Sequence, residues 1–117
     1  MVDFIFLRVL TEDNLTEGGF TMVYLQASIK LYPGKQQEFI ALLNSLTPVV
    51  AKHGWKLVGS FATFAGRLNT VLDLWELPNP NALQAALSDP EMQKAAPRIS
   101  EIVEDEVLTI LTKLPIG

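Results

Sequence analysis

The feature that most constrains this chain is an unbroken two-residue alternation over residues 23–31. Apolar side chains fall on one face and mostly polar ones on the other: Val23, Leu25, Ala27, Ile29 and Leu31 against Tyr24, Gln26, Ser28 and Lys30. Successive side chains of a β-strand point to opposite faces, so the pattern predicts a strand with one buried face. Pro33-Gly34 then ends the strand with a turn.

A helical period follows directly. Residues 35–52 carry one apolar stripe at helical spacing, formed by Phe39, Leu42, Leu43, Leu46, Val49 and Val50. Pro48 lies inside this helix and should bend or loosen its last turn. Gly54 is placed to end it in the left-handed conformation.

Residues 56–64 and 68–77 have the pattern of a hairpin around Gly66-Arg67, whose leading glycine favours a type II′ turn. This register predicts four cross-strand pairs that share one face: Ser60 with Asp73, Ala62 with Val71, Phe64 with Asn69, and Val58 with Trp75. The opposite face would hold Leu57, Phe61, Leu72 and Leu74. Because the second set is uniformly apolar, we expect it to pack under the helices, leaving the mixed set for a pocket or interface.

The second half repeats the order of helix and strand. Residues 81–87 predict a short helix, and Pro90 opens a second one whose stripe is Met92, Ala95, Ala96, Ile99, Ile102 and Val103. Pro97 should kink it. The acidic run 101–106 is expected to be a solvated helix face and loop, and residues 107–114 the last strand. The order βαββαβ predicts an α+β, ferredoxin-like fold with both helical segments on one face of an antiparallel sheet.

Residues 1–21 differ from the rest. A short apolar stretch at 4–10 precedes the polar, loop-like segment 11–19, and Met22 opens the strand pattern. We interpret 1–21 as a loosely attached extension, with Met22 as the natural start, and 22–117 as the domain; the alternative is an added edge strand at 4–10. Asp3 and Arg8 do not fit a secretory signal, and no apolar run reaches the roughly 18 residues of a membrane helix. We expect a cytoplasmic protein without membrane contact.

Composition excludes several classes of function. The net charge is −4 and basic residues are scattered singly, which argues against nucleic acid as a partner. The chain has no cysteine and one histidine, which removes thiolate chemistry and leaves no signal for a metal or another cofactor. With 49% hydrophobic residues, a chain of 117 has more apolar sequence than one small core hides. We therefore expect a homodimer that covers an apolar sheet face.

Several segments carry a resemblance to a known family. They are Tyr24, Lys30-Leu-Tyr-Pro-Gly-Lys35, Lys52-His-Gly-Trp-Lys-Leu-Val-Gly59, Gly66-Arg-Leu-Asn69, Val71-Leu-Asp-Leu-Trp75 and Leu87-Ser-Asp-Pro90. In this order and spacing, residues 22–115 resemble the NIPSNAP family of the dimeric α/β-barrel superfamily. The resemblance implies two ferredoxin-like sheets closed face to face, with a ligand inside each half. Relatives in that superfamily include cofactor-free monooxygenases, haem-degrading enzymes and muconolactone isomerase.

The chain departs from the family at polar positions. Where members often carry a Glu-x-Arg-x-Tyr pattern on the first strand, this chain has Leu25, Ala27 and Ile29. Asp73 stands where the family often has histidine, and residues 81–86 lack a commonly seen arginine. The family pattern would point the first-strand positions into the barrel, whereas the alternation puts them under the helices. The sequence leaves this choice open.

Two residues are candidates for catalysis. Asp73 lies mid-strand between leucines, where a carboxylate is costly unless paired. It is either a general base or a structural acceptor for Ser60, and the structural role is the commoner one. His53 has a suitable pKa range for acid–base work, but its place at a helix C-terminus favours a structural role with the helix dipole.

The candidate ligand-binding residues are Ser60, Trp75, Phe64, Gln26 and Ser28. Two functions remain. One is a half-barrel site for a small apolar or aromatic molecule, which the resemblance extends to cofactor-free oxygenation, isomerisation or cyclisation. The other is a non-catalytic dimeric scaffold with a filled interior. An open pocket beside Asp73 would favour the first.

Overall fold

The computed structural model describes residues 22–116, and residues 1–21, with their two alternative interpretations, lie outside this range. Its strands are β1 (Val23–Leu31), β2 (Lys56–Ala62), β3 (Thr70–Leu77) and β4 (Val103–Leu111). Its helices are α2 (Gln36–Ala51), α3 (Asn81–Leu87), α4 (Pro90–Lys94) and α5 (Ala96–Ile102). The strands form one sheet in the order β2-β3-β1-β4, and every neighbouring pair is antiparallel. The α+β, ferredoxin-like prediction is therefore confirmed.

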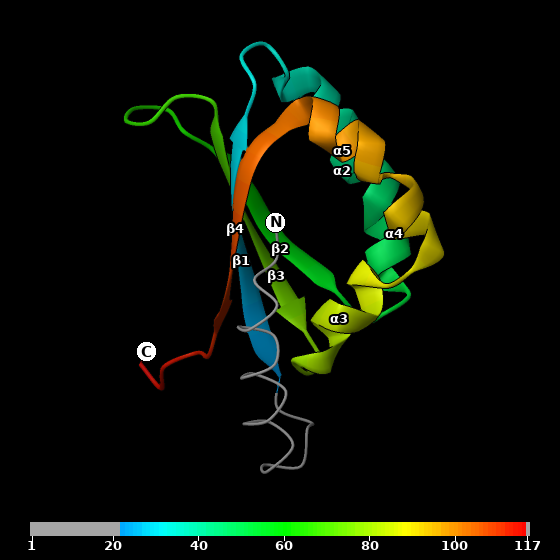
Figure 1. Cartoon of the computed structure of the whole chain (residues 1–117). Coiled ribbons are helices and arrows are strands. Elements are labelled where there is room, and N and C mark those ends of the chain that lie inside the picture. Colours follow the sequence, from blue (N-terminus) through cyan, green and yellow to red (C-terminus); the bar gives the residue numbers. More distant parts are fainter. Residues whose placement is uncertain (1–21, 117) are drawn as a thin grey trace.

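The helices cover one face of the sheet, and no helix of residues 22–116 covers the other face, here called the open face (Figure 1). The apolar set of β1, predicted from alternation, is buried beneath the helices: Val23, Leu25, Ala27, Ile29 and Leu31. This settles the choice that the sequence left open. None of the helices described over residues 22–116 is both long and apolar enough to cross a membrane.

Helix α2 follows the predicted stripe and buries Phe39, Leu42, Val49 and Val50. Pro48 lies inside the helix, which nevertheless continues to Ala51. Gly54 has a φ of +85°, as its predicted left-handed conformation requires. A Cβ at Gly54 would also lie 2.8 Å from Cγ of Pro78, so glycine is needed there for space as well.

The hairpin between β2 and β3 is wider than predicted. Residues 63–69 connect the strands in place of a two-residue turn, and Asn69 joins Gly66 in the left-handed region with a φ of 59°. The pairs Ser60–Asp73 and Ala62–Val71 are confirmed. A bulge between Leu57 and Gly59 places Leu57, rather than Val58, opposite Trp75, and the loop removes the predicted Phe64–Asn69 pair.

The predicted faces of this hairpin are reversed. Asp73 and Trp75 lie beneath the helices, with Asp73 only 2% exposed, whereas Leu72 lies on the open face and is 37% exposed. The cause is the pairing of β3 with β1, in which Asp73 lies opposite Ala27. Residues directly opposite each other share a face of the sheet. The buried face of β1 therefore decides the face of Asp73, and the apolar character of Leu72 does not.

The second half of the chain matches the prediction for α3 and corrects the end. The kinked helix is two helices that meet at Ala95, with Pro97 in the first turn of α5. Strand β4 begins at Val103 instead of residue 107, so most of the acidic run is strand. An edge strand tolerates these charges because they alternate between faces, and Glu104 pairs with Lys30 at 3.4 Å.

The open face carries apolar side chains from three strands. Phe61 is 59% exposed and Val107 54% exposed, and Leu72 and Leu111 are also exposed. Exposed apolar side chains gathered on one face of a sheet are typical of an interface. A twofold axis over the sheet would bury these side chains of each copy against those of the other.

If two copies pair through the open face, as we expect, Leu72→Asp should convert the dimer into a monomer, because it places a charge among the apolar side chains of that face. Sedimentation velocity should show the dissociation constant rising by about a hundredfold or more. Ile40→Asp, which changes an exposed side chain on the outer surface of α2, is the matched control and should leave the mass unchanged. A wild-type chain that stays monomeric at micromolar concentration would contradict the dimer.

Candidate functional site

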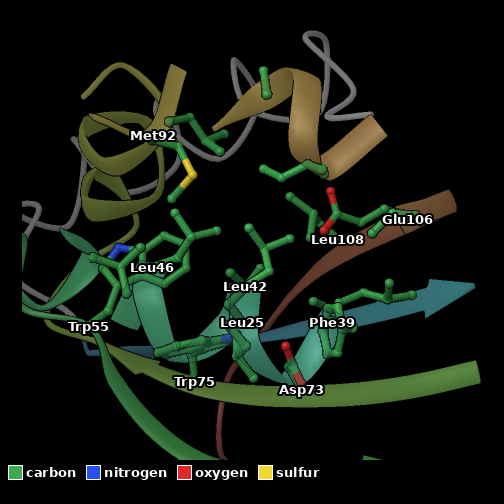
Figure 2. Close-up of a pocket in the computed structure, with 18 of the residues that line it drawn as sticks. Leu25, Phe39, Leu42, Leu46, Trp55, Asp73, Trp75, Met92, Glu106 and Leu108 are labelled. Carbon is green, nitrogen blue, oxygen red and sulfur yellow. The ribbon is translucent and has the colours of Figure 1, made fainter. Parts of the chain in front are cut away.

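A cavity of about 230 Å³ lies between the helix-covered face of the sheet and the helices (Figure 2). Its floor comes from β1, β3 and β4, and its walls and roof from α2, α4, α5 and the end of α3. The lining is almost entirely apolar, and its larger members include Leu25, Ile29, Phe39, Leu42, Leu46, Trp55, Trp75, Met92 and Leu108. An apolar cavity of about 150 Å³ is enough to hold benzene, so this one has room for an aromatic ring with a short side chain.

An aromatic pair closes one end of the cavity. Trp55 and Trp75 pack edge to face, with ring centroids 5.4 Å apart and an interplanar angle of 67°. The indole Nε1–H of Trp55 donates to the carbonyl of Ala82 in α3 at 2.9 Å, which fixes the ring. These are the only two tryptophans of the chain, so its tryptophan fluorescence comes entirely from the cavity wall.

Asp73 is the buried polar group on the floor. The Ser60 hydroxyl donates to its Oδ1 at 2.5 Å across the β2–β3 pair. Burial raises the pKa of Asp73, and the hydrogen bond from Ser60 offsets part of that rise. Figure 2 shows the carboxyl group directed from β3 toward the cavity. The sequence left two functions open, a ligand site and a scaffold with a filled interior. An open pocket beside Asp73 favours the ligand site.

Glu106 is a second carboxyl group in the lining, and the sequence analysis missed it. It lies on β4 opposite Ile29, while Asp73 lies on β3 opposite Ala27, so the two flank β1 on the same face. Burial raises the pKa of Glu106, and the nearby carboxylates of Asp73 and Asp105 raise it further. The sequence does hold a signal for this position, because Glu106 alternates with Leu108 and Ile110. That signal becomes visible only if β4 begins before residue 107.

His53 lies in a separate cluster at the junction of α2 and α4. Its Nε2 is 2.8 Å from Oδ2 of Asp89, which Lys52 also approaches at 3.4 Å. Asp89 accepts a bond from the backbone N–H of Glu91 at 2.8 Å and so caps α4. The bond from His53, followed by the cap and Lys52, lowers the pKa of Asp89 to about 2. The cluster fastens α4 to α2, and His53 is not part of the cavity lining.

The structure separates the other predicted ligand-binding residues. Trp75 lines the cavity, and Ser60 reaches it through Asp73. Gln26 and Ser28 alternate with the buried residues of β1 and therefore lie on the open face. Phe64 is 100% exposed in the hairpin loop. The cavity thus includes none of these three, because the expected mixed face is split between the two sides of the sheet. Within residues 22–116, no cluster of three or more His, Asp or Glu is arranged to hold a metal ion.

Comparisons with known proteins support the resemblance. The NIPSNAP family model matches residues 24–117. Many solved structures are similar to this chain, and three of them, each at 24% identity or less, show its fold. A NIPSNAP family protein from Agrobacterium tumefaciens has 24% identity, a TM-score of 0.70, and 83% of this chain and 97% of its own covered. An uncharacterized NIPSNAP domain protein from Burkholderia xenovorans has 20% identity, a TM-score of 0.69, and 83% and 98% covered.

A protein of unknown function from Rhodopseudomonas palustris has 18% identity, a TM-score of 0.67, and 93% of this chain and 95% of its own covered. No curated protein matches the sequence.

The raised pKa of Asp73 has a measurable consequence for stability. The folded state binds the Asp73 proton more tightly than the unfolded chain, so the stability that this proton contributes is present below the ordinary aspartate pKa of 3.8 and is lost as the pH rises through the folded pKa. Asp73→Asn keeps the acceptor for Ser60 and removes the charge. We predict that it is more stable than the wild type at neutral pH.

Denaturant unfolding across the pH range checks this. The advantage of Asp73→Asn should shrink as the pH falls and disappear below 3.8. Glu101→Gln, which removes an exposed carboxylate on α5, is the control and should give no such gain. An asparagine variant that is less stable at neutral pH would contradict the interpretation.

Proposed function

We propose that this chain, which belongs to the NIPSNAP family, binds a small, mostly apolar molecule in the cavity between its sheet and its helices. The observation that carries the proposal is an apolar cavity of about 230 Å³ with the buried carboxyl group of Asp73 in its floor. Ligand sites combine apolar walls with a few placed polar groups in this way. The scaffold alternative, which needs a filled interior, is not favoured by this cavity.

A structural role alone does not explain the buried carboxyl group. Burying Asp73 opposes folding at neutral pH, because desolvation disfavours its charged form. Ser60 satisfies one carboxyl oxygen, but an alanine or valine at this position would need no such partner. Polar groups whose burial opposes folding are typical of functional sites. Asp73 is therefore the residue that we assign to recognition of the ligand.

Tryptophan fluorescence can be used to follow binding in the cavity, because both tryptophans line it. Titration with phenethyl alcohol should change tryptophan emission saturably if the cavity binds compounds of this size. A rise in the unfolding temperature would confirm that the compound binds the folded state.

We predict that Ala27→Leu weakens this binding by about tenfold or more, because the added carbon atoms extend from the floor into the cavity. Its free energy of unfolding should change by no more than about 1.5 kcal/mol, since the new side chain enters empty space. Ala41→Leu, on an exposed position of α2, is the matched control and should bind as the wild type does. Unchanged binding in Ala27→Leu would place the ligand elsewhere.

If the bound molecule is also a substrate, we propose that Asp73 accepts its proton. Cofactor-free oxygenation, isomerisation and cyclisation, the classes that the superfamily suggests, begin by moving a proton on the substrate. Ser60 orients Oδ1, and the raised pKa of Asp73 makes it a stronger base than an exposed aspartate. Asp73→Asn should then abolish turnover while the fold remains intact by circular dichroism. Retained turnover would remove Asp73 from this role.

A further inference from the structure

The ionisable side chains of the cavity lining are all acidic. The lining includes two carboxyl groups, Asp73 and Glu106, and among the described residues it includes no lysine, arginine or histidine. The two acidic residues lie on strands that flank β1 and are offset by two residues of register, so their backbones are about 12 Å apart. In Figure 2 the side chains of both extend toward the cavity. When both are ionised, the interior carries negative charge in a low-dielectric space, where electrostatic effects are strong.

Asp73 has hydrogen-bonding capacity left for a ligand. Ser60 donates to Oδ1. The carboxyl group lines the cavity, so Oδ2 can accept a further bond from that side. A carboxylate in an otherwise apolar cavity gains from a further donor, which offsets the cost of its desolvation. A ligand that brings a charged N–H donor would supply it.

The neighbouring aromatic groups favour the same kind of ligand. Trp75 lies two residues from Asp73 on the same strand and face, and it lies along the floor of the cavity beside Asp73 (Figure 2). Phe39 and Trp55 also line the cavity. Aromatic faces attract cations, and tryptophan does so most strongly of the aromatic side chains. Carboxylates beside aromatic rings in an enclosed space form a suitable site for an organic cation.

We propose that the cavity selects a small organic amine in its protonated form, an assignment that rests on the proposed function. The ammonium group lies at the floor, where it donates to Asp73 and is attracted by Glu106. The aromatic or branched apolar body of the ligand lies against Trp75 and the leucines of α2. An anion of the same size is repelled by both carboxylates, and a neutral molecule leaves their charge uncompensated.

Three ligands of nearly equal shape separate these cases. At neutral pH phenethylamine is a cation, phenethyl alcohol is neutral and phenylacetate is an anion. Isothermal titration, together with tryptophan emission, should give phenethylamine a Kd at least about tenfold below that of phenethyl alcohol. Phenylacetate should show no measurable binding.

The variant Asp73→Asn/Glu106→Gln removes both charges and retains the shape. It should bind phenethylamine and phenethyl alcohol with equal affinity, and retained alcohol binding shows that its cavity has folded. Glu101→Gln, which changes an exposed carboxylate on α5, should keep the preference for the amine. An amine preference that survives the double substitution overturns the proposal, because the cation is then recognised elsewhere.

The outcomes distinguish a failure of the amine assignment from a failure of the ligand cavity itself. If the wild type binds phenethyl alcohol as tightly as phenethylamine, or binds phenylacetate best, the amine assignment is wrong and the ligand cavity stands. If none of the three compounds binds at millimolar concentration and tryptophan emission stays constant, the proposed function fails together with the amine assignment.

Discussion

The pairing of β1 with both of its neighbours is the constraint on which the rest of the structure depends. Ala27 lies opposite Asp73 on β3 and opposite Leu108 on β4, and residues paired in this way share a face of the sheet. Burying the apolar set of β1 therefore also places Asp73, Trp75 and Glu106 beneath the helices. A slip of one residue in the register would send all of them to the open face. The strongest sequence pattern thus positions side chains on strands far from it in the chain.

The cavity persists because its walls belong to two separate parts of the core. One cluster of buried residues is centred on Trp75 and Leu83, where α3 packs against the end of the sheet, and the other on Phe39 and Ile102 at the opposite end. The cavity takes lining residues from both clusters. Collapsing the helices onto the floor would press apolar side chains against the carboxyl group of Asp73, which already lacks contact with bulk solvent. Desolvation of that group therefore opposes closure of the space, while the edge-to-face tryptophan pair fixes one end of it.

The sequence predicted the features that depend on a local pattern of residues. Its predictions were wrong where pairing between strands decides which face a side chain occupies. Strand β1, helices α2 and α3 and the left-handed Gly54 follow from periodicity, glycine and proline. The face of Asp73 depends on the β1–β3 pairing, which joins distant segments and carries no local signal. Glu106 was assigned to a loop because charged residues are depleted in strands. Ser60 and Asp73 were recognised as partners, since their register depends only on the short hairpin that joins them.

Strands β3 and β4 each depart, at one pair of positions, from the usual pattern of a sheet with one solvated face. On β3, Asp73 points toward the helices and Leu72 away from them, and on β4, Glu106 and Val107 do the same. In a monomer this arrangement places carboxyl groups inside and large apolar groups in water, which is unfavourable on both sides. Both unfavourable exposures are relieved when each face of the sheet contacts a binding partner. A second copy would cover the apolar side, and a ligand with a polar group would neutralise the acidic side. The same departure in two strands on either side of β1 is what the proposed ligand site and the expected dimer would together account for.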